Sequence, residues 1–88
     1  MTDNATVDAI LRALLADVLG LGERRAAALT DDSGLFGALP EFDSMAVATV
    51  LTEIEDRLGI IIDDDEIDGE IFETYGNLLA FSERKVAG

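Results

Sequence analysis

Residues 39–72 read LPEFDSMAVATVLTEIEDRLGIIIDDDEIDGEIF, and this stretch decides the fold. From position 44 to position 58, apolar side chains recur every three or four residues, which is the period of an amphipathic α-helix. The inward stripe consists of Val47, Val50, Leu51, Ile54 and Leu58. We therefore predict a helix over residues 44–58 that ends at Gly59, as helices commonly end at a glycine.

A second helical pattern precedes this stretch. Residues 3–19 carry apolar side chains at helical spacing, with Asp3 as a plausible cap. The connection over residues 20–43 is long for a compact domain, so we expect a short helical piece within Glu23–Leu29. We also expect its apolar residues to pin the connection to the core; they are Leu21, Leu29, Leu35, Phe36 and Leu39.

Shorter elements follow residue 59. The run Ile60-Ile61-Ile62 has no partner strand in the chain, so an extended apolar linker is the preferred interpretation. We predict a short helix over residues 64–71, carrying Ile67 and Ile71, and a last helix over residues 75–86 capped by Thr74. Leu78, Leu79 and Val86 are expected to face inward, and Gly76 to weaken that helix by up to ~1 kcal/mol. The predicted fold class is all-α.

Composition limits what such a bundle can do. The chain has 88 residues, which suits one domain over residues 1–88, and its net charge of −13 repels nucleic acid and anionic membranes. No apolar run approaches the ~20 residues that span a bilayer, and we expect a soluble, cytoplasmic protein. Without histidine or cysteine, independent catalysis is not expected, and any thiol that the protein uses must be imported.

Ser44 opens the predicted helix directly after Asp43. A hydroxyl in the first turn lies at the positive end of the helix dipole, where unpaired backbone N–H groups favour a phosphate ester. This placement predicts a scaffold for a phosphate-linked prosthetic group. The alternative is that Asp43 or Ser44 merely caps the helix.

The order of these features resembles the acyl carrier protein family over about half of the chain: Asp43-Ser44-Met45, an apolar stripe, an acidic helix end, and Gly-Ile-x-Ile followed by acids. In that family a phosphopantetheinyl transferase and magnesium attach 4′-phosphopantetheine from coenzyme A to the serine. The resemblance implies that Ser44 carries the arm, that Asp43 contacts the transferase, and that three main helices plus one short helix form the bundle.

The outward face of the helix over residues 44–58 carries Met45, Thr49, Glu53 and Asp56. The resemblance implies that partner enzymes with basic docking patches bind a monomeric carrier there, among them the transferase and an acyl-loading ligase or transferase. A solvated acidic face with one exposed methionine is the alternative for these residues.

This chain differs from fatty-acid carriers, which usually have acidic residues in the first two turns after the serine. Here Ala46 and Thr49 leave those turns neutral. The sequence also resembles D-alanyl carrier proteins, which a dedicated adenylating ligase loads. We therefore predict a discrete carrier of thioester-bound intermediates in a specialised pathway, with a D-alanyl or aminoacyl carrier as the alternative. If the interior held an acyl chain, this architecture would line the space with Ile54, Ile62, Ile67 and Ile71.

The acidic run Asp63–Gly69 suggests a calcium loop, but a loop that starts at Asp64 has Tyr75 where the bidentate glutamate belongs. No dedicated metal site is predicted. The hypothesis of another class is an acidic helical calcium-binding or interaction module without a prosthetic group.

Overall fold

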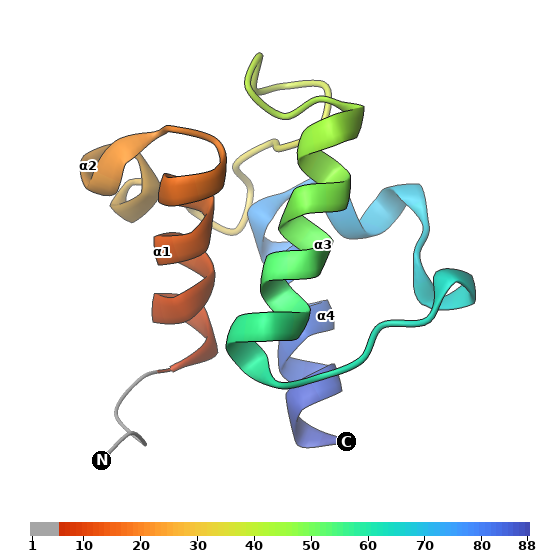
Figure 1. Ribbon diagram of the computed structural model, residues 1–88. Coiled ribbons are helices and arrows are strands. Elements are labelled where there is room, and N and C mark those ends of the chain that lie inside the picture. The colour runs from red at the N-terminus through yellow and green to blue at the C-terminus, as the bar shows by residue number, and fades with distance from the viewer. Residues whose placement is uncertain (1–5) are drawn as a thin grey trace.

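Figure 1 shows the computed structural model, which describes residues 6–88. Within these residues the chain forms helices and no strand, which confirms the all-α prediction. The elements are α1 (Val7–Val18), α2 (Gly22–Ala27), α3 (Ser44–Leu58), the 3₁₀ helices η2 (Asp64–Glu66) and η3 (Gly69–Phe72), and α4 (Tyr75–Ala87). The start of α3 lies at the end of the bundle opposite the last turn of α4 (Figure 1). None of these helices is long and apolar enough to cross a membrane.

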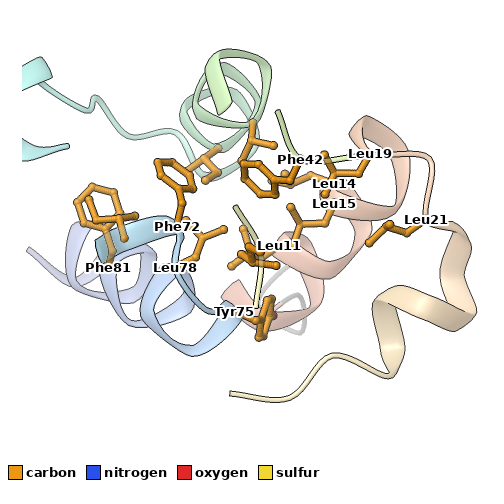
Figure 2. Close-up of a cluster of buried hydrophobic side chains, with 14 of the residues drawn as sticks. Leu11, Leu14, Leu15, Leu19, Leu21, Phe42, Phe72, Tyr75, Leu78 and Phe81 are labelled. Carbon is orange, nitrogen blue, oxygen red and sulfur yellow. The ribbon is translucent and has the colours of Figure 1, made fainter. Parts of the chain in front are cut away.

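One hydrophobic core joins α1, α3 and α4 (Figure 2). Leu11, Leu14 and Leu15 of α1 are fully buried against it. The core also takes Val50 and Ile54 from α3, Tyr75, Leu78 and Phe81 from α4, and Phe42 and Phe72 from the connections. The Phe42 and Phe72 rings lie 5.6 Å apart between centroids, so aromatic side chains fill the space between α3 and α4.

Helix α3 has the predicted bounds because both of its ends are set by local chemistry. The Asp43 carboxylate accepts a hydrogen bond from the backbone N–H of Ala46 at 2.9 Å, which satisfies one of the unpaired donors of the first turn. At the other end Gly59 has φ +67°, a left-handed conformation that costs glycine little. Both predictions, the start at Ser44 and the stop at Gly59, are confirmed.

The caps of the outer helices are partly as predicted. Thr74 caps α4 by accepting from the N–H of Asn77 at 3.1 Å. Helix α1 is capped by Thr6, whose hydroxyl accepts from the N–H of Ala9 at 3.0 Å. The cap predicted at Asp3 lies outside the described residues.

The helix predicted over residues 64–71 is instead two 3₁₀ turns. Ile67 and Asp68 are extended between them. The Asp68 carboxylate accepts from the N–H groups of Glu70 and Ile71 at 2.9 and 3.3 Å and so starts a new turn. Because an aspartate that bonds to its own following backbone competes with helix propagation, one continuous helix does not form. The linker before it, Ile60–Ile62, contains no helix or strand, as predicted.

Two residues expected to face the core are exposed. The Phe36 side chain is 51% exposed and Val86 is 47% exposed. Val86 continues the stripe of Tyr75, Leu78 and Ser82, but it lies in the last turn of α4. Phe36 is held through its backbone, and its ring projects toward solvent.

The connection before α3 is fastened to the start of α4 by backbone hydrogen bonds. Phe36 N–H donates to the Phe72 carbonyl at 2.9 Å, and Gly76 N–H donates to the Asp31 carbonyl at 3.0 Å. A Cβ at Gly76 would lie 2.8 Å from that Asp31 oxygen, so only glycine allows this approach. Gly76, predicted as a weak point of the helix, is therefore a packing requirement.

Arg12 joins three helices on the other side of the bundle. Its Nη1 lies 2.8, 3.1 and 2.9 Å from the carbonyl oxygens of Ala26 and Ala27, which end α2, and of Leu29, which follows it. The guanidinium also stacks 4.6 Å from the ring centroid of Tyr75 in α4. One side chain thus satisfies carbonyls that a helix C-terminus leaves unpaired.

Candidate functional site

Ser44 is the first residue of α3, and its side chain is exposed. The Asp43 carboxylate occupies the N–H of Ala46, and the Asp43 carbonyl accepts from the N–H of Val47 at 3.0 Å. No acidic residue follows in the first turn of α3. The hydroxyl therefore lies at the positive end of a 15-residue helix, in a setting suited to a phosphate ester.

The other two serines of the chain are not comparable. Ser33 accepts from the N–H of Thr30 at 2.8 Å and so closes a local turn. Ser82 is fully buried and donates its hydroxyl hydrogen to the Leu78 carbonyl at 2.9 Å. Only Ser44 combines exposure with the start of a long helix.

The predicted partner face lies where expected but has two halves. Near Ser44, Met45 is 80% exposed and Thr49 donates its hydroxyl to the Met45 carbonyl at 3.2 Å, so this half is neutral. Farther along, Glu53 accepts from Nε of Arg57 at 2.8 Å, while Asp56 is exposed.

Arg57 also reaches Asp17 of α1 at 3.1 Å. The hydrogen bonds that Arg57 donates to Glu53 and Asp17 raise the pKa of Arg57. Arg57 is thus shared between Glu53 and Asp17, so it compensates the charge of Glu53 only in part.

A groove of about 390 Å³ begins at Ser44. It is bordered by Phe36, Ser44, Val47, Ile67, Asp68, Gly69 and Phe72. Of the four isoleucines expected to line an acyl space, Ile67 borders this groove, whereas Ile54 is fully buried in the core. Sequence reasoning missed Phe36 as a site residue, because an isolated aromatic residue in a connection gives no sign of which way its ring points.

The acidic run does not form a metal site in the structure. Glu66 accepts from the N–H of Asp63 at 3.1 Å and pairs with Lys85 at 2.7 Å. The Lys85 hydrogen bond lowers the pKa of Glu66. Among residues 6–88 no group of three potential metal-ligating side chains converges, which gives the calcium-module hypothesis no support.

Comparison with known proteins gives two matches. The family described as "Phosphopantetheine attachment site" matches residues 9–83. The solution NMR structure of a holo acyl carrier protein from Nitrosomonas europaea is 46% identical in sequence, covers 93% of this chain and 96% of its own, and superimposes with a TM-score of 0.83. No curated protein matches the chain.

Proposed function

The chain belongs to the acyl carrier protein family, and from this premise we propose that Ser44 is the residue that carries its prosthetic group. The group is 4′-phosphopantetheine, and the protein is a carrier and not an enzyme. The observation that supports Ser44 is its position as the exposed first residue of α3, directly after the capping Asp43.

In the proposed attachment, the Ser44 oxygen bonds to the phosphorus that bears pantetheine, the serine proton is lost, and the adenosine bisphosphate portion of coenzyme A leaves. The serine proton passes to a base of the transferase. One carboxylate oxygen of Asp43 caps α3 by accepting the Ala46 N–H, so its other oxygen remains for a contact with the transferase. When bound, the group supplies the thiol that the cysteine-free chain lacks and holds cargo as a thioester.

We further propose a specialised pathway with a dedicated adenylating ligase. The first two turns of α3 are neutral, so a partner that relies on acidic side chains next to Ser44 would find none there, and Glu53 farther along is paired with Arg57. Met45, Thr49 and Asp56 remain the proposed contacts. We also propose that residues 1–88 form a single carrier domain, since both halves of the chain contribute to one core, and that the protein acts in the cytoplasm, where coenzyme A is available.

Incubation with a broad-specificity transferase and coenzyme A tests the attachment site by intact mass. We expect one added arm in the wild type and in Ser33→Ala, and none in Ser44→Ala, with the same helical circular dichroism in all three. An arm retained on Ser44→Ala contradicts the assignment. The mass of protein purified from its native host then separates acyl from aminoacyl cargo.

A further inference from the structure

The groove that begins at Ser44 has two sides of different origin. Ser44 and Val47 of α3 form one side, and Phe36 joins Ile67 and Phe72 on the other. Asp68 and Gly69 complete the rim. The attachment residue proposed above is therefore a lining residue of the groove, and anything bonded to its hydroxyl starts within it.

The side opposite α3 is held in place. Phe36 N–H donates to the Phe72 carbonyl at 2.9 Å. The Phe36 ring meets the Phe42 ring edge-on with centroids 6.2 Å apart, and Phe42 in turn contacts Phe72. Phe36 is thus positioned although it is half exposed, and its uncovered ring area would gain stability from an apolar cover.

The space behind the groove is already filled. Phe42 and Phe72 are 2% and 4% exposed, and Val50 and Ile54 of α3 are fully buried beside them. Because protein interiors are close-packed, a chain could pass inward only by displacing these side chains. A group tethered at Ser44 therefore meets a surface groove before it meets a cavity.

We infer that this groove binds the proximal part of the phosphopantetheine arm, with the two geminal methyl groups next to its phosphate covering the Phe36 ring. The inference rests on attachment at Ser44. The methyl groups are the most apolar part of the arm near the serine, and the amide groups that follow can stay in water beyond Asp68. The cargo then lies outside the core, and Phe36 is a positioning residue for the arm.

The test uses holo protein made with a transferase and coenzyme A, with modification confirmed by intact mass. Nuclear Overhauser effects between the arm methyl groups and the Phe36 ring protons are expected in the wild type. The Phe36 ring should shift the methyl resonances of the arm upfield in the wild type. This shift should be absent in Phe36→Ala and in Phe36→Leu, although the leucine keeps an apolar contact with the arm. Val86→Ala is the matched control, because Val86 is similarly exposed but does not line the groove.

The outcomes separate the two proposals. If the methyl resonances of the arm lie where they do in free phosphopantetheine, and Phe36→Ala leaves them unchanged in protein of the correct holo mass, the arm does not bind in the groove. The proposed attachment at Ser44 is unaffected by that result. Large shifts of the Phe42 and Phe72 resonances on loading an acyl chain also overturn binding in the groove, since they place the cargo in the core. Failure to add any arm to Ser44 overturns both proposals.

Discussion

The corner where α1, α2 and α4 meet differs from the end of the molecule around Ser44 in the kind of contact that builds it. At the corner, Arg12 satisfies three carbonyl oxygens and lies over the Tyr75 ring, while Tyr75 donates its hydroxyl to Asp8. Around Ser44, large apolar side chains stay exposed, among them Met45 and Phe36.

The difference separates two tasks. The polar network at the corner is partly buried, and a group in it that is left without a partner costs free energy. Exposed apolar residues contribute little to folding and are available for contact with other molecules. We therefore expect polar contacts to contribute to stability at the corner, whereas the exposed apolar side chains around Ser44 are free to contact other molecules.

The largest expected effect contrasts two apolar truncations. Leu14→Ala should lower the free energy of unfolding by about 2–5 kcal/mol, because Leu14 is fully buried and the change leaves a cavity. Phe36→Ala removes a larger side chain but should cost only about 1 kcal/mol or less, since half of the ring already faces water. Urea denaturation measures both, and equal losses would remove the distinction between the core and the exposed apolar residues around Ser44.

The second effect contrasts two arginines. Arg12→Ala should lower stability by about 1–2 kcal/mol, because it removes hydrogen bonds to the part-buried carbonyl oxygens of Ala26 and Leu29. Arg25→Ala breaks only an exposed ion pair with Glu41 and should barely change the melting temperature. Thermal melts of the two variants sharpen the comparison, and a larger loss for Arg25→Ala would contradict it.

The smallest effect concerns Tyr75, the chain's one tyrosine. Burial, and then the hydrogen bond to Asp8, raise the pKa of Tyr75. A raised pKa in the folded state means that this contribution to stability is complete below about pH 10, where unfolded tyrosine titrates, and is lost as pH rises above it. Tyr75→Phe should cost about 1 kcal/mol at neutral pH and flatten the alkaline loss of stability.

Phenolate absorbance reads this titration directly, because no other tyrosine contributes. If Tyr75 of the folded protein titrates near pH 10, its hydroxyl is not held by the hydrogen bond to Asp8. The same hydrogen bond lowers the pKa of Asp8, so the carboxylate's contribution is present at neutral pH and is lost as pH falls through its folded-state pKa.

Features that depend on neighbours in the sequence were predictable. The bounds of α3 follow from Asp43 and Gly59, and the start of α4 follows from Thr74, because caps act within a few residues. The position of Ser44 at a helix start follows from the same local rules. The exposed half of α3 could likewise be predicted from its helical period.

Features that depend on distant partners were not predictable. The carbonyl oxygens that Arg12 binds lie 14 to 17 residues along the chain. The need for glycine at position 76 comes from Asp31, and the backbone of Phe36 is bonded to Phe72, which lies 36 residues along the chain. The split of residues 64–71 was missed because helix spacing alone does not reveal that Asp68 bonds to its own following backbone.

The last turn of α4 lies at the opposite end of the bundle from the start of α3 (Figure 1). A fluorophore, a surface linker or a fused protein joined after Gly88 would therefore leave the Ser44 end free. Immobilisation through the last turn of α4 would present the start of α3 outward, which suits measurement on a sensor chip of molecules that bind there.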